Sequence, residues 1–331
     1  MKLKRLGDSK VNVTPIAFGA WAIGGWMWGG AEETDAIKAI RASFHAGITT
    51  IDTAPVYGFG KSEVLVGRAM EGIARDKYQI LTKYGMNWKT HEGEFSFDTV
   101  DNDGKPLKIY KNSKRASVIK ECEDSLQRLK TDYIDLFQIH WADNTTPIAE
   151  TMDAVNTLMK EGKVRAAGVC NYSSAQVAEA LKTIKLVSNQ VPYSLIHRAI
   201  EKDIVPQALQ KSMSIVPYSP LQRGLLTGKI KPDHKFNDGD TRANNRFYKP
   251  ANIERVNAML ETFKPIAKDH GATLTQLMIN WTTRQPGMDC VLVGARDEAQ
   301  VKDNVKALDF KLSETELELI RDAAEKLVLT E

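Results

Sequence analysis

Short runs rich in β-branched residues alternate eight times along this sequence with stretches that have the hydrophobic spacing of amphipathic helices. Such alternation predicts parallel strands wrapped by helices. No change in composition within the 331 residues suggests a linker. A single (β/α)8 barrel domain over residues 1–331 is therefore the most economical prediction. The eight expected strands are residues 16–21, 49–53, 78–84, 134–140, 164–171, 187–192, 214–219 and 290–294.

Three segments and an extra C-terminal helix depart from the minimal barrel. Residues 1–13 alternate polar and apolar positions and are expected to form a β-hairpin that closes the bottom of the barrel. Residues 86–112 and 222–250 are long, polar and poorly periodic, and they follow the third and seventh strands. We expect both to lie over the C-terminal face, where barrel enzymes carry their active sites. Ser62 and Ser313 are expected to cap the second helix and the final helix.

Charge and cysteine usage narrow the classes of partner. The formal net charge of +3 comes from 45 basic and 42 acidic residues without a long run of one sign, so nothing indicates a nucleic-acid or membrane-surface partner. No apolar run is long enough for a membrane span, and no secretory signal is apparent, so we expect a cytoplasmic protein. Cys122, Cys170 and Cys290 are widely spaced and lack a neighbouring metal-ligand set, which predicts neither disulfides nor a metal site.

Side chains that can carry chemistry stand at the C-terminal ends of the expected strands. In a (β/α)8 barrel these ends surround a single pocket. Each side chain alone has a structural explanation, such as a loop cap or a solvated strand end, but their convergence on one face favours a functional site. The positions are Trp21, Asp52, Lys83, His140, Asn171, Gln190, Tyr218 and Gly294, with Tyr57 shortly after the second strand.

Four of these side chains suit the reduction of a carbonyl group. A tyrosine such as Tyr57 has an ordinary pKa of about 10 and is a poor acid unless a cation lies beside it. Lys83 can supply that cation, Asp52 can offset the cost of burying it, and His140 can orient a carbonyl oxygen. The set would protonate an oxygen that gains charge as hydride adds to carbon. No GxGxxG lies between a strand and a helix, so a nicotinamide cofactor would bind across the barrel mouth.

Six stretches of the sequence carry the motifs of one known family. They are GITTIDTAPVYGFGKSEVLVGRAM (47–70), ILTKYG (80–85), IDLFQIHWAD (134–143), GKVRAAGVCNYSSAQV (162–177), SPLQRGLLTGK (219–229) and GARDEAQVKDN (294–304). Together they resemble the aldo-keto reductase superfamily from about residue 3 to about residue 304. The last two stretches resemble the bacterial and potassium-channel β-subunit branches. The chain as a whole is similar to the bacterial general-stress and inositol-type NADP-dependent reductases.

The resemblance implies a catalytic role for each of the four residues. Tyr57 would be the general acid, Lys83 and Asp52 its partners, and His140 the residue that orients the substrate. In the channel β-subunits the residue equivalent to His140 is usually not a histidine, which favours the bacterial enzyme branch. The implied activity is reduction of aldehydes and ketones to alcohols, or the reverse oxidation.

The resemblance also implies a nicotinamide cofactor, with NADP preferred over NAD. Asn171 and Gln190 would bind the carboxamide, Tyr218 would stack on the ring, and the pyrophosphate would lie against the loop after the seventh strand. The residues that bind the 2′-phosphate in vertebrate relatives are replaced here, and Arg296 is expected to bind it instead, unless it pairs with a neighbouring carboxylate. The expected cofactor-binding residues are Ala20, Trp21, Asp52, Cys170, Asn171, Gln190, Tyr218, Ser219, Pro220, Leu221, Gln222, Arg223, Gly224, Lys229, Arg242, Gly294, Arg296, Gln300, Asp303 and Asn304.

Aromatic side chains are expected to line or cover the substrate pocket, which would take a small aldehyde, ketone or sugar. Trp21 and Trp141 flank catalytic positions, whereas Trp26, Trp28 and Trp88 can equally pack within a loop. The expected pocket residues are Trp21, Tyr57, Trp88, His140 and Trp141.

Two other functions stay open from the sequence. A regulatory subunit similar to the potassium-channel β-subunits would bind the cofactor without useful turnover. A barrel aldolase would use Lys83 as a Schiff-base amine. The physiological substrate, the direction of reaction, and whether the protein is a monomer or a homo-oligomer stay open as well.

Overall fold

A computed structural model describes residues 1–26, 32–236 and 240–331. Its main sheet confirms the eight-stranded barrel, with neighbouring strands in the order β12-β11-β10-β9-β5-β4-β3-β13. A parallel bridge between Ile215 and Met288 nearly closes the ring beside β12 and β13. The strands are β3 (Ile16–Gly19), β4 (Thr50–Asp52), β5 (Gln79–Tyr84), β9 (Leu136–Ile139), β10 (Ala167–Cys170), β11 (Leu186–Pro192), β12 (Ser214–Tyr218) and β13 (Val291–Gly294).

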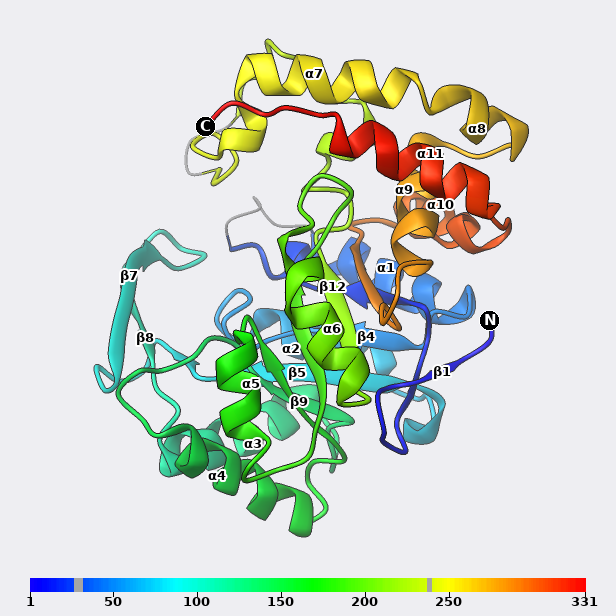
Figure 1. Ribbon diagram of the computed structural model, residues 1–331. Coiled ribbons are helices and arrows are strands. Elements are labelled where there is room, and N and C mark those ends of the chain that lie inside the picture. The colour runs from blue at the N-terminus through cyan, green and yellow to red at the C-terminus, as the bar shows by residue number, and fades with distance from the viewer. Residues whose placement is uncertain (27–31, 237–239) are drawn as a thin grey trace.

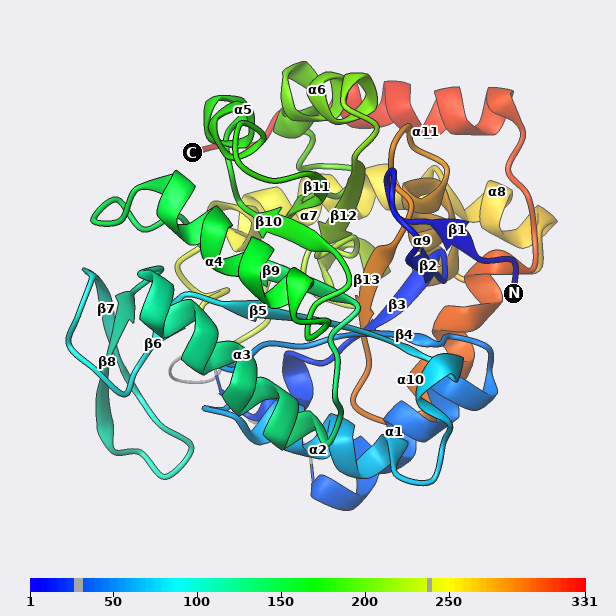
Figure 2. The same cartoon turned by 90° about the horizontal axis from the view of Figure 1, so that it is seen from below.

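Helices surround the barrel (Figures 1 and 2). No helix in the described part of the chain is long and apolar enough to cross a bilayer. The helices are α1 (Glu33–His45), α2 (Lys61–Met70), α3 (Arg115–Leu129), α4 (Ile148–Lys160), α5 (Ser174–Ala180), α6 (Ile204–Gln210), α7 (Pro250–Glu261), α8 (Lys264–Asp269), α9 (Leu274–Thr283), α10 (Glu298–Val305) and α11 (Glu314–Glu325). Short 3-10 turns are η1 (Ala22–Gly24), η2 (Arg75–Lys77), η3 (Ala199–Lys202), η4 (Leu225–Thr227), η5 (Arg246–Tyr248) and η6 (Lys306–Leu308).

The N-terminal hairpin is present as expected. Strands β1 (Lys4–Arg5) and β2 (Asn12–Val13) pair antiparallel. Leu6 and Val13 are fully buried and belong to the same apolar cluster as Leu81 inside the barrel. The hairpin therefore closes the barrel end opposite the strand C-termini.

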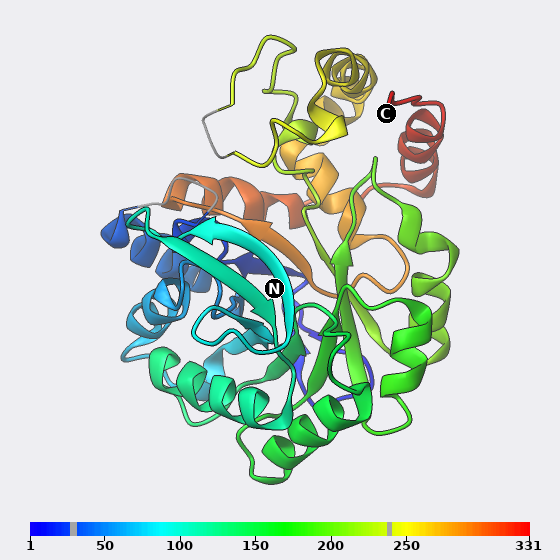
Figure 3. The same ribbon diagram turned by 90° about the vertical axis from the view of Figure 1, so that its left-hand side faces the viewer.

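The segment after the third barrel strand is more regular than its sequence indicates. Strands β6 (Met86–Asn87), β7 (Glu94–Val100) and β8 (Pro106–Lys111) form an antiparallel sheet in the order β6-β8-β7. The β7–β8 hairpin extends across one side of the barrel mouth (Figure 3). Its strands were hidden in the sequence because most of their side chains stay partly exposed and polar residues occupy both faces.

One of the two expected helix caps is confirmed. Ser313 and Glu316 form a reciprocal capping box at the start of α11. The prediction for Ser62 is wrong, because Gly60 occupies the cap position of α2. The Ser62 hydroxyl is instead fully buried, where it donates to the carbonyl of Ala20 at 2.9 Å and contacts the Thr53 hydroxyl at 2.9 Å. Ser62 thus joins the loops that follow β3 and β4.

Candidate active site

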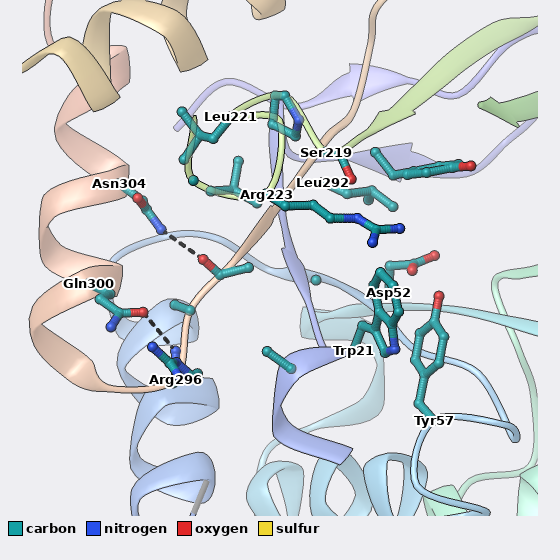
Figure 4. A pocket seen from close by; sticks show the side chains of 18 of the residues that line it. Trp21, Asp52, Tyr57, Ser219, Leu221, Arg223, Leu292, Arg296, Gln300 and Asn304 are labelled. Atoms are coloured by element: carbon teal, nitrogen blue, oxygen red, sulfur yellow. Dashed lines mark hydrogen bonds between the residues drawn. The ribbon is translucent and has the colours of Figure 1, made fainter. Parts of the chain in front are cut away.

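A cavity of about 720 Å³ opens at the C-terminal ends of the barrel strands. It extends from the side chains around Tyr57 to the start of α10 (Figure 4). Most residues expected at the site from the sequence line this cavity. They are Trp21, Asp52, Tyr57, His140, Trp141, Asn171, Gln190, Tyr218, Ser219, Pro220, Leu221, Arg223, Gly224, Lys229, Arg242, Gly294, Arg296, Gln300, Asp303 and Asn304.

A buried ammonium group connects the side chains at the inner end of the cavity. Lys83 is fully buried, and its Nζ donates to Asp52 Oδ1 at 2.6 Å, to the Thr53 carbonyl at 3.0 Å and to the Tyr57 hydroxyl at 3.2 Å. The other Asp52 oxygen accepts from Gln190 Nε2 at 2.8 Å. All three N–H groups of the ammonium therefore have acceptors, and one of those acceptors is the phenol oxygen that faces the cavity.

Burial and charge set the protonation states of this cluster. Burial raises the pKa of Tyr57 to about 12, although the Lys83 charge opposes the shift. Burial is the strongest single influence on Lys83 and acts to lower its pKa, but the attraction and hydrogen bond to Asp52, together with attraction to Tyr57 and Cys170, outweigh it, so this pKa is raised. Burial, together with the Lys83 charge, lowers the pKa of His140 well below its ordinary value. At neutral pH the phenol keeps its proton, the ammonium is charged and the imidazole is neutral.

Aromatic contacts hold Tyr57 from two sides. The Trp21 ring stacks on it at 6.0 Å between centroids and 24° between planes. The His140 ring meets it edge to face at 5.7 Å and 81°. These contacts leave the phenol oxygen between Lys83 and the cavity.

The turn that carries Tyr57 requires close backbone approach. Gly58 has φ +65°, and a Cβ placed on it would lie 2.0 Å from the carbonyl oxygen of Gly24. A side chain at Gly24 would likewise meet the Tyr57 backbone at 2.7 Å. Only glycine fits both positions, so the loops after β3 and β4 are packed directly against each other.

Side chains from β10 to β12 meet beside the catalytic cluster. The Tyr218 hydroxyl donates to Asn171 Oδ1 at 3.0 Å, and Asn171 Nδ2 donates to the His140 carbonyl at 3.0 Å. Asn171 adopts φ +58°, which aims its amide toward these partners. Cys170, expected at the cofactor, is buried beneath this group and is not among the described residues that line the cavity. Ala20 and Gln222, also expected at the cofactor, and the expected catalytic residue Lys83 are likewise buried and are not among the described lining residues.

The loop after β12 has an unusual run of left-handed backbone. Ser219, Gln222, Arg223 and Gly224 have φ of +59°, +45°, +47° and +95°. Successive backbone N–H groups in such a run can form a concave anion site. The Arg223 guanidinium lies 5.2 Å over the Trp21 ring and donates to the Thr241 hydroxyl at 2.6 Å. The Gln222 and Gly224 N–H groups already donate to the Ser219 carbonyl at 2.8 Å and the Leu221 carbonyl at 3.0 Å, so the group that this loop brings to the cavity lining is the Arg223 cation.

The outer end of the cavity lies at the start of α10. Figure 4 shows Arg296, Gln300 and Asn304 on this side, away from Tyr57. Gln300 accepts from the Arg296 backbone N–H at 3.0 Å, and Asn304 donates to the Gly294 carbonyl at 3.3 Å. Asp303 accepts from Gln276 at 2.6 Å. Hydrogen bonds between residues of the cavity wall therefore orient the side chains at its outer end.

An apolar wall beside Tyr57 is formed by Trp26, which the sequence left open between the pocket and loop packing, and by Phe97, which the sequence prediction missed. Trp26 and Phe97 both line the cavity and stack at 6.1 Å with 8° between planes, and Trp26 Nε1 donates to the Thr99 hydroxyl at 2.9 Å. Alternation along residues 94–100 is the signal that could have identified Phe97. Further lining residues not singled out beforehand are Gly19, Ala22, Met86, Thr227, Ile230, Thr275, Leu292, Val293 and Ala295.

The expected tryptophans are not all brought to the cavity. Trp141 lines it and stays 40% exposed, so it stands at the rim. Trp88 packs edge to face on Phe59 at 5.5 Å and is not among the lining residues that the structure describes. Trp28 lies outside the described residues. Within the described ranges, no group of three His, Cys, Asp or Glu side chains is suited to hold a metal ion.

Comparison with known proteins identifies the family of the chain. The model of the "Aldo/keto reductase family" matches residues 15–325. "Aldo-keto reductase YhdN" of Bacillus subtilis is 37% identical over 304 residues, which are 91% of this chain and 87% of that protein. The "NADH-specific methylglyoxal reductase" of Escherichia coli is 36% identical over 332 residues, which are 99% of each chain.

Solved structures lead to the same family. The glycerol dehydrogenase AKR11B4 from Gluconobacter oxydans is similar with a TM-score of 0.88 and 36% identity, over 98% of this chain and 96% of that one. The holo form of aldo-keto reductase AKR11C1 from Bacillus halodurans has a TM-score of 0.77 and 26% identity, over 100% and 98% of the two chains. The chain therefore belongs to the aldo/keto reductase family, whose members interconvert carbonyl compounds and alcohols with a nicotinamide cofactor.

Proposed function

We propose that the protein reduces aldehydes or ketones to alcohols with NADPH, or runs the reverse oxidation, and that Tyr57 is its general acid. The observation that carries the proposal is the buried Lys83 ammonium, which bonds both Asp52 and the Tyr57 hydroxyl at the inner end of the cavity. A bound reduced nicotinamide would supply hydride to the carbonyl carbon. Tyr57 then donates its proton to the carbonyl oxygen as that oxygen gains charge.

The neighbouring residues support this proton transfer. Lys83 stabilises the negative charge left on the Tyr57 oxygen, and Asp52 keeps the ammonium charged in a buried position. Neutral His140, whose ring touches that of Tyr57, orients the carbonyl oxygen by a hydrogen bond. The apolar surface for an uncharged substrate is formed by Trp21, Trp26, Phe97 and Trp141.

The cavity residues fit a dinucleotide that extends from Tyr57 to α10. Asn171 and Gln190 supply amide groups beside the catalytic cluster, and Tyr218 offers a ring face for the nicotinamide. The left-handed backbone run after Tyr218, with Lys229 and Arg242 on the same wall, would bind the pyrophosphate. Ala20, Cys170 and Gln222 are proposed to support this wall from behind, since their side chains are buried beneath it.

The preference for NADP over NAD is proposed from Arg296. Its exposed guanidinium lines the outer cavity, and no ion pair joins it to a carboxylate among the described residues. The two neighbouring acids are engaged elsewhere: Asp297 caps α10 by accepting from the Gln300 backbone N–H at 2.8 Å, and Glu298 pairs with Lys302 at 2.7 Å. Arg296 is therefore available to a 2′-phosphate.

Because the E. coli relative is named NADH-specific, the cofactor preference needs its own test. We expect wild-type kcat/KM to be higher with NADPH than with NADH, and Arg296→Ala to lower that ratio about tenfold, as for a lost charge-assisted contact. Lys306→Ala is the matched control, since this exposed cation follows α10, lies outside the cavity lining and pairs with no carboxylate among the described residues. A ratio that Arg296→Ala leaves unchanged would remove Arg296 from the 2′-phosphate site.

The geometry disfavours an aldolase. A Schiff-base lysine needs a free amine, whereas Lys83 uses all three N–H groups and its pKa is raised. Borohydride trapping with a carbonyl substrate checks this: a stable adduct on Lys83 would support the aldolase.

Tyr57→Phe tests the reductase proposal directly. The variant keeps the ring that packs on Trp21 and His140 and removes only the hydroxyl. We expect loss of carbonyl reduction, followed by absorbance with a panel of aldehydes, ketones and sugars. Nucleotide binding, followed by quenching of protein fluorescence, should be kept. An unchanged rate in Tyr57→Phe would exclude Tyr57 as the acid. If the wild-type protein binds nucleotide but turns over no substrate of the panel, that result would favour a regulatory subunit.

A further inference from the structure

We infer that the C-terminal tail, residues 327–331, together with Asn252 of α7, positions the cofactor-binding loop after β12 and thereby sets nucleotide affinity. The inference rests on the proposed function, because it takes this loop to be the pyrophosphate site. The tail lies more than 100 positions along the chain from that loop. Figures 1 and 3 show the end of the chain running beside α7.

The tail is recognised by one buried amide. Asn252 is fully buried, and its Oδ1 accepts from the Thr330 backbone N–H at 2.9 Å and from the Thr330 hydroxyl at 3.0 Å. Its Nδ2 donates to the Thr330 carbonyl at 2.9 Å and to the Arg246 carbonyl at 2.8 Å. Both N–H groups of the Asn252 amide are therefore used, and the amide can donate to no further partner. Asn252 therefore joins the tail to η5.

Further contacts fix the tail along the same surface. Arg255 donates to the Val328 carbonyl at 2.9 Å. Glu331 pairs with Arg246 through its side chain and accepts from Lys249 through its carbonyl. Leu327 and Leu329 pack on the large apolar cluster that includes Leu225 and Leu226 of η4. The tail is thus held by side chains of η5 and α7 and by packing on the large apolar core.

Tyr248 connects η5 to the loop after β12. It ends η5, is buried, and its hydroxyl donates to the Gln222 carbonyl at 2.5 Å. The Gln222 side chain accepts from the Ser194 hydroxyl at 2.9 Å, so Gln222 is held from two sides. Gln222 directly precedes Arg223 and Gly224, whose left-handed backbone lines the cavity. Left-handed backbone at non-glycine residues persists only where surrounding contacts enforce it, and Tyr248 supplies one of them.

The catalytic cluster does not depend on these contacts. Lys83, Asp52 and Tyr57 are held by β4, β5 and the turn after β4. Loss of the tail should therefore weaken nucleotide binding while the rate at saturating nucleotide stays close to wild type. A general loss of stability would not produce this split between KM and kcat.

Two variants test the inference, with fluorescence titration by NADPH and NADH as the main measurement. The first deletes residues 328–331, and the second is Tyr248→Phe, which removes only the hydroxyl. Because Tyr248→Phe loses one buried hydrogen bond, we expect its Kd for the nucleotide that binds more tightly to wild type to rise about fivefold. The deletion should raise this Kd at least as much. Trypsin should also cut within residues 222–250 faster in the deletion variant. Tyr133→Phe is the matched control, since its hydroxyl donates to the Arg75 carbonyl at 3.3 Å far from the cavity.

The outcomes separate the inference from the proposed function. Wild-type protein that binds neither nucleotide would refute both. If the wild-type protein binds nucleotide, two results would refute the inference alone. One is a Kd that stays within about twofold of wild type in both Tyr248→Phe and the deletion variant. The other is a rise in Kd for Tyr133→Phe that equals the rise for Tyr248→Phe. If the deletion variant does not fold, Arg255→Ala, which removes the hydrogen bond to the Val328 carbonyl, tests the tail in the same titration beside Tyr248→Phe.

Discussion

Replacing Lys83 by methionine tests the central electrostatic claim, because it removes the buried ammonium while keeping an unbranched apolar side chain. The Nζ lies 3.2 Å from the Tyr57 oxygen. At an effective dielectric constant of about 20, a full charge on that oxygen interacts with the ammonium by about 5 kcal/mol, and half a charge by about 2.6 kcal/mol. The expected loss in kcat/KM for carbonyl reduction is therefore about 10²- to 10⁴-fold.

The same change should destabilise the fold. Asp52 would keep only Gln190 as a side-chain partner in a buried position. Breaking a buried ion pair by removing one partner costs about 3–5 kcal/mol. The double variant Lys83→Met/Asp52→Asn removes the unpaired charge, so it should recover much of the stability but none of the activity.

The assay follows nucleotide oxidation with the best carbonyl substrate of the wild-type enzyme, and thermal unfolding of all variants. Nucleotide binding by fluorescence quenching is the control for Lys83→Met, because Lys83 lies outside the loop after β12 and does not line the cavity. A Lys83→Met enzyme that folds, binds nucleotide and reacts within about fivefold of wild type would refute the assignment of Lys83 as the partner of Tyr57.

Three further predictions concern pH and packing. Because Tyr57 acts while protonated and its pKa is raised to about 12, kcat/KM for reduction should show no loss as pH rises from about 7 to about 10; a fall with a midpoint near 8 would contradict this protonation state. Ser62→Ala leaves the Ala20 carbonyl without its buried donor and should lower the free energy of unfolding by about 1–3 kcal/mol, measured by urea titration; an unchanged midpoint would show that this bond is dispensable. Gly58→Ala should cost about 2 kcal/mol or more and reduce activity, since its Cβ meets the Gly24 carbonyl at φ +65°; Gly72→Ala, at φ +85° with nothing within 4 Å, is the control and should keep full activity.

Much of the fold was predictable because it depends on local periodicity. The barrel strands are short buried runs rich in apolar residues, and the longer helices have a repeating apolar face, so both signals can be read without knowing distant partners. In a (β/α)8 barrel the strand ends meet by topology. Asp52, Lys83 and His140 were therefore expected together, with Tyr57 beside them. The structure places Asp52, Tyr57 and His140 in the cavity lining, with Lys83 buried against Asp52 and Tyr57.

Other features needed distant contacts that no local pattern reveals. The β7–β8 hairpin looked irregular because it is only partly buried, so Phe97 was missed. Ser62 lies near the start of a helical pattern, where a serine commonly caps, yet its hydroxyl donates to a carbonyl 42 positions away. Trp88 was expected at the pocket because it follows a strand end, but it packs on Phe59.

The sequence by itself determined the barrel, the family and the set of candidate catalytic side chains, because periodicity and motif spacing are properties of neighbouring residues. The tertiary structure decided how those side chains behave. The pKa of Tyr57 is raised even though Lys83 lies beside it, because burial outweighs the nearby charge. The order of the cofactor loop likewise depends on Tyr248, Asn252 and a tail that only folding brings near. Burial and long-range contact are products of packing, so neither can be read from a stretch of residues alone.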